Sequence, residues 1–245
     1  MKRALARPSF RIRTIWPRLK FHGLRVSMQG DHVSLAVWKR VFRGDYEAPE
    51  IKALLALLKP NDKLLELGAG MGLVSAVAAK MFPSLVIHSY EANPAMIPVI
   101  NELHESNRIT NISVHNVVLM PVEEDGERTF YVAKSFAESS LLDVGSDSGR
   151  AFPRSLLQVA QRDIRKALSE FRPDVLICDI EGGEAELFQD IDLSCLRALV
   201  LELHPDRIGR IAEARIYDTA AAAGLYPKIE LCSGTVVAFE KVAPP

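Results

Sequence analysis

The apolar positions of this chain follow two alternating patterns. Short continuous apolar runs, typical of buried parallel strands, alternate with longer stretches in which apolar residues recur every three or four positions, as on one face of a helix. The predicted strands lie at residues 62–68, 85–92, 112–119, 174–180 and 197–204, and the predicted helices at 73–82, 94–107, 163–171, 184–191 and 210–224. Pro83 ends the first helix and Pro94 opens the second. Strands that alternate with helices in this way predict a parallel, doubly wound α/β sheet.

Three further segments complete the expected fold. Residues 127–133 have the pattern of an extra strand, and residues 139–153 form a loop rich in Ser, Gly and Asp, of a kind that carries function or covers a site. The segment 226–242 contains two apolar runs on either side of Ser233-Gly234. It predicts a C-terminal β-hairpin that closes the sheet with an antiparallel pair.

Length and composition favour one domain. The chain has 245 residues, 48% of them hydrophobic, which suffices for one substantial core. Residues 1–30 contain eight of the 30 basic residues and no acid, so the rest of the chain has 22 basic against 31 acidic residues, a balance of −9. We therefore expect a basic N-terminal extension at 1–40 and the main domain at 41–245. Such an arm can contact nucleic acid or an anionic surface, but a solvated tail is the commoner explanation.

Cysteine usage and hydropathy indicate the compartment. Cys178, Cys195 and Cys232 are odd in number and scattered, without the paired spacing of a zinc site or a disulfide framework. We expect a reducing, cytoplasmic location and no structural metal. No stretch reaches about 18 consecutive apolar residues, and the N-terminus lacks the apolar segment of a signal peptide. A membrane span is therefore not expected.

The stretch LLELGAGMG ends a predicted strand and opens a helix. Its alternate glycines, Gly68, Gly70 and Gly72, allow a tight turn and a close approach of the backbone to a ligand, although a turn needed for packing alone is the alternative. The spacing differs from the G-x-G-x-x-G of dinucleotide folds, because Leu73 stands where their third glycine would be. Glu66, two residues before the first glycine, would repel a diphosphate and favour a ligand with an ammonium group. S-adenosylmethionine has that group, a cationic sulfonium and no phosphate.

A second acid follows the next strand. Glu91 lies 19 residues beyond Gly72, where a carboxylate can accept hydrogen bonds from both hydroxyls of a ribose. Such an acid serves NAD and S-adenosylmethionine equally well, and a surface glutamate is the alternative explanation. The choice between the two ligands therefore depends on Glu66 and on the glycine spacing, which favour S-adenosylmethionine.

Several motifs occur in a fixed order along the chain: GDYEAPE, LELGAGMG, SYEANP, SSLLDV, DIEGGE and LELHP. Together, over about residues 42–205, they resemble the FkbM-type family of S-adenosylmethionine-dependent methyltransferases. The resemblance implies a single-domain, Rossmann-like class I methyltransferase fold, with a doubly wound, mostly parallel seven-stranded sheet and a C-terminal antiparallel β-hairpin. It also implies methyl transfer, most often to a hydroxyl of a carbohydrate or polyketide-like product.

The same resemblance implies which residues bind the cofactor. Those expected at its methionine end are Glu66, Gly68, Ala69, Gly70 and Gly72, with Glu91 at the ribose, Ala92, Asn116 and Val117 at the adenine, and Tyr46 and Glu47 as a lid. The chain departs from the family in two places. Glu66 and Met71 replace parts of an Asp-x-Gly-Ala-Asn loop, and Ile177 stands where a lysine commonly precedes the acid of the DIEG motif by two positions.

The candidate catalytic residues come from two strand ends. Because side chains alternate along a strand, Asp179 and Glu181 point to one side, as do Glu202 and His204. In the strand order of such methyltransferases the two strands are neighbours, so four polar groups would surround one pocket. We predict His204 as the base, since its ordinary pKa of about 6.5 lies near working pH. Asp179 would orient the acceptor hydroxyl or act as the base itself, and Glu181 and Glu202 would position these groups or bind substrate.

Other interpretations stay open. Asp179, Glu181 and Glu202 are hard oxygen ligands of the kind that hold Mg²⁺, although we assign no metal. A non-catalytic protein that binds S-adenosylmethionine is a second alternative, and an RNA methyltransferase, prompted by the basic N-terminus, is a third. Neither an Asn/Asp-Pro-Pro-Tyr/Phe motif nor a clear Lys-Asp-Lys-Glu tetrad is present. We expect a hydroxylated small molecule or glycan as the acceptor and no nucleic acid partner, and we leave the oligomeric state open.

Overall fold

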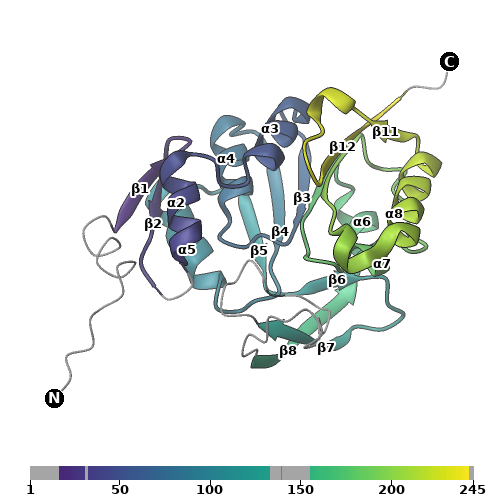
Figure 1. Ribbon diagram of the computed structural model, residues 1–245, viewed down its shortest axis with the longest axis horizontal. Helices are drawn as coiled ribbons and strands as arrows, with labels where there is room; N and C mark the ends of the chain where they lie inside the picture. The colour runs from purple at the N-terminus through teal and green to yellow at the C-terminus, as the bar shows by residue number, and fades with distance from the viewer. Residues whose placement is uncertain (1–16, 31–32, 133–138, 140–154, 243–245) are drawn as a thin grey trace.

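The computed structural model describes residues 17–30, 33–132, 139 and 155–242. Within these residues, seven strands form the central sheet: β3 (Lys63–Leu67), β4 (Val86–Tyr90), β5 (Ile112–His115), β9 (Val175–Cys178), β10 (Ala198–Glu202), β11 (Leu225–Pro227) and β12 (Val236–Lys241). Their order in space is β11-β12-β10-β9-β3-β4-β5 (Figure 1). The strands from β10 to β5 are parallel, and β12 runs antiparallel to both of its neighbours. The expected α/β fold with a mostly parallel sheet is confirmed.

Helices cover both faces of the sheet, because adjacent residues of each strand point to opposite sides. Leu64 belongs to one core cluster and Leu65 to the other. The Leu64 side is covered by α3 (Ala48–Leu57), α4 (Leu73–Met81) and α5 (Ile97–Asn107), and the Leu65 side by α6 (Ile164–Phe171), α7 (Glu184–Leu187) and α8 (Pro205–Ala222). The carboxyl ends of the parallel strands meet at one edge, where open α/β sheets bind ligands.

The structure interrupts the third predicted strand. β5 ends at His115, and Val118–Met120 form β6, which belongs to a separate sheet. The side-chain amide of Asn116 donates to the carbonyl oxygens of Glu91 (2.8 Å) and Ala92 (3.1 Å). These hydrogen bonds hold the chain in the turn between the two strands. The prediction of one continuous strand was therefore wrong.

The separate sheet contains β6, β7 (Gly126–Val132) and β8 (Ser155–Asp163), in the order β6-β8-β7. β8 pairs in parallel with β6 and antiparallel with β7. Figure 1 shows this small sheet at the bottom of the view, apart from the main sheet. β7 confirms the predicted extra strand, whereas β8 was not predicted. Of the loop expected at 139–153, only Ser139 lies within the described residues.

The C-terminal antiparallel pair is confirmed, with a longer connection than expected. β11 pairs with β12, and the 3-10 helix Ile229–Leu231 interrupts the segment where the first hairpin strand was predicted. α8 begins at Pro205 and has a break at Gly209 (φ 76°, ψ 161°), so the helix predicted from residue 210 starts directly after this break. α7 ends at Leu187 rather than at residue 191.

Part of the basic N-terminal segment packs on the domain. β1 (Arg18–Phe21) and β2 (Leu24–Ser27) form a hairpin, and α2 (Leu35–Arg43) follows it (Figure 1). The hairpin and α2 contribute buried residues to the same core cluster as Leu64, and β2 contacts α5. α2 crosses the boundary expected between residues 40 and 41. None of the helices in the described part of the chain combines the length and apolarity needed to cross a membrane.

Candidate active site

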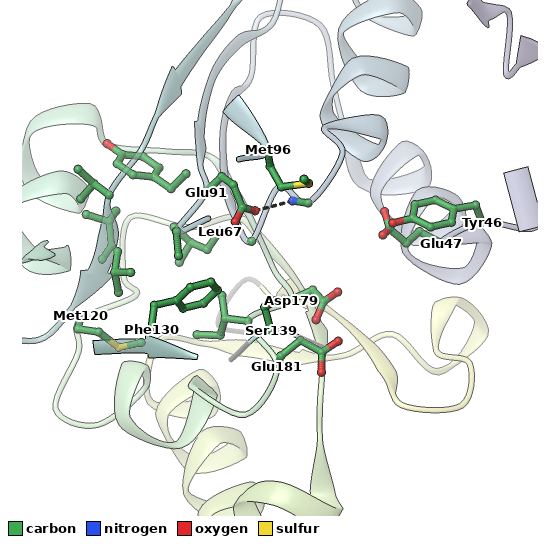
Figure 2. A pocket seen from close by; sticks show the side chains of 18 residues that line it. Tyr46, Glu47, Leu67, Glu91, Met96, Met120, Phe130, Ser139, Asp179 and Glu181 are labelled. Atoms are coloured by element: carbon green, nitrogen blue, oxygen red, sulfur yellow. Dashed lines mark hydrogen bonds between the residues drawn. The ribbon is translucent and has the colours of Figure 1, made fainter. Parts of the chain in front are cut away.

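A pocket opens where β3, β4 and β9 end (Figure 2). Residues that directly follow these strands form much of its wall, as expected for a ligand site on a parallel sheet. The predicted site residues that line it are Tyr46, Glu47, Gly68, Gly70, Glu91, Ala92, Val117, Asp179 and Glu181. The predicted site residues that do not line it are Glu66, Ala69, Gly72, Asn116, Glu202 and His204.

Two glycines of the loop are required by contacts within the protein itself. A Cβ atom on Gly68 would lie 1.7 Å from the carbonyl oxygen of Asp179, and one on Gly72 would lie 3.0 Å from Cγ2 of Ile100. Both residues also have positive φ angles, 84° and 72°. The close approach that these glycines permit is therefore to the chain's own residues, and Gly70 is the glycine whose backbone faces Glu91 in the pocket.

Glu91 is held at the pocket wall by backbone donors. The N–H of Gly70 donates to Oε2 and the N–H of Asn93 donates to Oε1, both at 2.7 Å (Figure 2 shows the first). Burial raises the pKa of Glu91 to about 7, although these hydrogen bonds favour the ionised form. A carboxylate accepts at about four lone-pair sites, so Glu91 can still accept hydrogen bonds from a ligand.

Glu66 does not point into the pocket, contrary to the expectation that it lines the methionine end. Its carboxylate oxygens accept from the N–H of Ser75 (3.1 Å) and from the hydroxyl of Ser89, and the residue is 3% exposed. Burial raises its pKa. The side chain faces α4 because residues alternate along β3, so Glu66 connects β3, β4 and α4 behind the glycine loop.

One end of the pocket is apolar. The lining residues that create this surface are Leu67, Tyr90, Met96, Val117, Val118, Leu119, Met120, Phe130 and Ile180. Only Val117 among them was predicted as a site residue. The apolar run that continues to Met120 was a usable signal, but Phe130 comes from β7 and no local pattern connects it to the site. An apolar surface beside an acid that can accept hydrogen bonds from a ligand suits a planar heterocycle such as adenine.

The other end of the pocket is acidic. Figure 2 shows the carboxylates of Asp179 and Glu181 on the same side, with Tyr46 and Glu47 beyond them. Glu47 and Glu181 have φ angles of 45° and 55°, a left-handed conformation that costs about 1–3 kcal/mol for a residue other than glycine and is concentrated at functional sites. Burial raises the pKa of Glu47 to about 8. Burial, with the charges of Glu202 and Glu181, holds the pKa of Asp179 well above its usual value.

His204 lies against this acidic end and contacts three carboxylates. Its Nδ1 is 2.8 Å from Oε1 of Glu184, and its Nε2 is 3.4 Å from Oε2 of Glu181 and 3.7 Å from Oδ1 of Asp179. Burial lowers the pKa of His204, but the hydrogen bond to Glu184 and the neighbouring charges outweigh burial, so the pKa lies above 6.5. Glu202 accepts from the hydroxyl of Thr235 (3.2 Å). Glu184 was not predicted as a site residue, although it ends the DIEGGE motif.

A family comparison agrees with this geometry. The model of the methyltransferase FkbM domain matches residues 66–224. This match covers more than half of the chain, and the protein belongs to that family. It is an S-adenosylmethionine-dependent methyltransferase, and the expected family and cofactor are confirmed. No curated protein matches the chain.

Several solved structures are similar at low sequence identity. A precorrin-6y C5,15-methyltransferase from Geobacter metallireducens has 13% identity and a TM-score of 0.47, over 78% of this chain and 87% of that one. A Methanococcus jannaschii TYW2 in complex with AdoMet has 13% identity and a TM-score of 0.41, over 92% and 86%. An Aeropyrum pernix fibrillarin with bound S-adenosyl-L-methionine has 15% identity and a TM-score of 0.40, over 78% and 73%. Similarity at this level assigns no acceptor to this chain.

Proposed function

We propose that this methyltransferase methylates a hydroxyl of a carbohydrate or a polyketide-like small molecule. The observation that carries the proposal is that Asp179 and Glu181 present their carboxylates to the same pocket as Glu91 (Figure 2). A carboxylate beside the cofactor can accept the hydrogen bond of an acceptor hydroxyl and fix its oxygen for attack. Alignment of this kind supplies about 7–11 kcal/mol of the barrier.

The chain's residues fit S-adenosylmethionine, which supplies a methyl group that its sulfonium already activates. Glu91 would accept from the ribose hydroxyls, and the apolar end around Met96 and Phe130 would receive the adenine. Buried acids such as Glu47 and Asp179 have raised pKa values because burial and neighbouring negative charges disfavour their ionised forms. A ligand with positive charge relieves that repulsion, so the acidic end complements the ammonium and sulfonium groups.

The acceptor hydroxyl must also lose its proton, and we assign that task to Asp179. Asp179 lines the pocket, and its raised pKa makes it a stronger base than an ordinary carboxylate. His204, whose Nε2 is 3.7 Å from Asp179 Oδ1, would stabilise the carboxylate and carry the proton onward. A base in position contributes about 10²–10⁴-fold in rate.

Calorimetric titration tests the cofactor half of the proposal. We expect S-adenosylmethionine to bind and NAD not to bind. Glu91→Ala should remove the binding, whereas Glu102→Ala, a matched change of an exposed glutamate on α5, should not alter it. Binding of NAD instead, or equal binding by the two variants, would contradict the assignment of Glu91.

Transfer of a labelled methyl group to a panel of hydroxylated glycans and polyketides tests the acceptor half. We expect Asp179→Asn with His204→Ala to keep cofactor binding and to slow transfer by about 10²–10⁴-fold. Asp206→Asn is the control, because Asp206 is an exposed acid two residues after His204. Undiminished transfer by the double variant would refute the assignment. Cofactor binding without transfer to any acceptor would favour a non-catalytic protein, and transfer to RNA alone would favour an RNA methyltransferase.

A further inference from the structure

We propose that Asp179, Glu181 and His204 form a binding site for one divalent metal ion at the acidic end of the pocket. One ligand atom from each of the three residues lies within 4.8 Å of the other two. His204 Nε2 is 3.4 Å from Glu181 Oε2 and 3.7 Å from Asp179 Oδ1. Ligands that bind a metal at about 2.0–2.2 Å lie about 3.0–3.5 Å from one another, so small side-chain shifts would bring the three atoms to one ion.

The orientation of His204 is the second observation that points to a metal. Glu184 has a completely buried side chain, and its Oε1 is 2.8 Å from Nδ1 of His204. Glu184 is itself held by the N–H of Gly182, which donates to Oε1 at 3.2 Å. With Nδ1 engaged, Nε2 is the nitrogen that faces Asp179 and Glu181. A histidine that ligates a metal almost always gives its other ring nitrogen to a carboxylate or carbonyl in this way.

Unpartnered oxygens give the third observation. Although the Asp179 side chain is 28% exposed as a whole, its Oδ1 atom is buried and has no hydrogen-bond partner among the described residues. Oε2 of Glu184 is also buried and has no hydrogen-bond partner among the described residues. Buried polar groups are nearly always paired in folded proteins, and each exception requires an explanation. A cation bound by Asp179 and His204 would give the Oδ1 atom of Asp179 a direct partner.

Arg207 limits how the ion can be placed. Its Nη2 lies 2.8 Å from Glu181 Oε2, and its Nη1 donates to the carbonyl oxygen of Glu181 (2.7 Å). The guanidinium therefore fixes Glu181 in its left-handed conformation and would share this carboxylate with the ion. Asp179 and His204 would then be the principal ligands, with Glu181 completing the set.

The donor set indicates the class of metal. Imidazole nitrogen suits transition metals and carboxylate oxygen suits Mg²⁺ and Mn²⁺, so a mixed set with one imidazole favours Mn²⁺ over Mg²⁺. The role of the ion depends on the proposed function. An ion held by residues that line the pocket would bind the acceptor oxygen and lower the pKa of its hydroxyl, and the proton would be released to water. In the loaded enzyme, Asp179 would act as a ligand rather than as the base.

Titration of the full chain with MnCl₂, after treatment with a chelator and without cofactor or acceptor, tests the site directly. We expect one bound ion per chain by loss of the free Mn²⁺ resonance signal, and a nitrogen coupling from imidazole in the spectrum of the bound ion. His204→Ala should remove this coupling and weaken binding at least tenfold. Asp206→Asn should leave both the affinity and the coupling unchanged.

Glu184→Gln distinguishes a loss of metal affinity caused by the orientation of His204 from one caused by unfolding, because it leaves all three ligands in place. Removal of a group that orients a metal-ligating histidine costs about 10–100-fold in affinity. We expect that loss with an unchanged thermal unfolding midpoint, and this variant with the wild-type spectrum decides the outcome if His204→Ala does not fold. No bound Mn²⁺, bound Mn²⁺ without nitrogen coupling, or equal affinity in His204→Ala would overturn the proposal. Binding of S-adenosylmethionine, measured separately by calorimetry, shows whether the proposed function also fails when the metal site is absent.

Discussion

Acidic residues occur at two places around the pocket, and they differ in how many hydrogen bonds the chain donates to their carboxylate oxygens. Where β3 and β4 end, Glu66 and Glu91 have both carboxylate oxygens engaged by donors of the chain. Beyond β9, Asp179 Oδ1 and Glu184 Oε2 are buried with no partner among the described residues. All of these carboxylates are largely removed from water, so the difference is one of hydrogen bonding rather than of depth.

The two halves of the site therefore differ in whether the chain alone satisfies the hydrogen bonds of their carboxylates. The half around Glu91, where we propose that the cofactor binds (the cofactor half), is preorganised, because the N–H groups of Gly70 and Asn93 fix its carboxylate. The half around Asp179, where we propose that the acceptor binds (the acceptor half), keeps buried carboxylate oxygens without a hydrogen-bond partner among the described residues. Proteins accept such a loss of stability where function requires it.

The largest effect is expected from a substitution at Gly68, because Gly68 lies directly against the backbone of Asp179. In Gly68→Ala the new Cβ would lie 1.7 Å from the carbonyl oxygen of Asp179. Gly44→Ala is the matched control, because Gly44 has a similar φ angle (79° against 84°) and nothing within 4 Å of its Cβ position. We expect both variants to lose about 1–2 kcal/mol through the left-handed conformation, and Gly68→Ala to lose about 1–3 kcal/mol more through overpacking. Urea unfolding measures both, and equal losses would contradict the contact.

The preorganised half can be tested by a change at Glu91. Glu91→Gln keeps the shape of the side chain but removes the negative charge that accepts from two backbone donors and, in the proposed function, from the ribose. Hydrogen bonds to charged groups contribute about 1.5–3 kcal/mol each, so we expect affinity for S-adenosylmethionine to fall by about 100-fold. Calorimetry measures the change, with Glu102→Gln as the exposed control. Unchanged affinity in Glu91→Gln would show that the ribose binds elsewhere.

The same carboxylate predicts a dependence of cofactor affinity on pH. The pKa of Glu91 in the free protein is about 7, and in the proposed function the ionised form accepts from the ribose hydroxyls. Below pH 7 the group must first lose a proton, so affinity should fall about tenfold, or 1.4 kcal/mol, for each unit of pH. Above pH 7 this contribution should be constant. Titrations at pH 6, 7 and 8 measure the slope, which should be nearly absent in Glu91→Gln.

Substitutions beside the two groups of acids should change stability in opposite directions. Ser89→Ala removes the hydroxyl that donates to Glu66 and leaves a buried carboxylate oxygen without its donor, which should lower the free energy of unfolding by about 1–3 kcal/mol. Asp179→Asn removes a buried charge that has neighbouring negative charges, and should raise stability by about 1 kcal/mol. Thermal unfolding should show shifts of about 2–4 °C per kcal/mol. A loss of stability in Asp179→Asn would mean that the acceptor half is also complete.

The sequence predicted the elements whose period is unambiguous. β3, β4, β9 and β10 are short apolar runs with helices between them, and a parallel sheet follows from their alternation. The N-terminal hairpin was missed although its signal is present. Residues 18–27 alternate around His22 and Gly23, both of which adopt the positive φ angles of a tight hairpin turn (45° and 79°). The concentration of basic residues led to the interpretation as a solvated tail.

The break after His115 could not be predicted, because apolar residues continue on both sides and no glycine or proline marks it. Asn116 is a residue type common in turns, but one asparagine within an apolar segment does not locate a break. The contact that fixes the turn is with Glu91 and Ala92, which are distant in sequence. Within the site, the strand-end acid Glu91 followed from its position. The sequence did not predict that Glu66 points away from the pocket. A strand pattern shows that side chains alternate, but it does not show which face of the strand the ligand occupies.

The turn at Asn116 has a further consequence, for the behaviour of the chain among its own copies. It ends β5 after four residues, and β11 at the opposite edge of the main sheet has three. An exposed edge strand is a template on which another chain can add a strand, and short edges limit that pairing. The interruption that builds a wall of the pocket therefore also keeps this edge of the sheet short, which limits the addition of a strand from another copy of the chain.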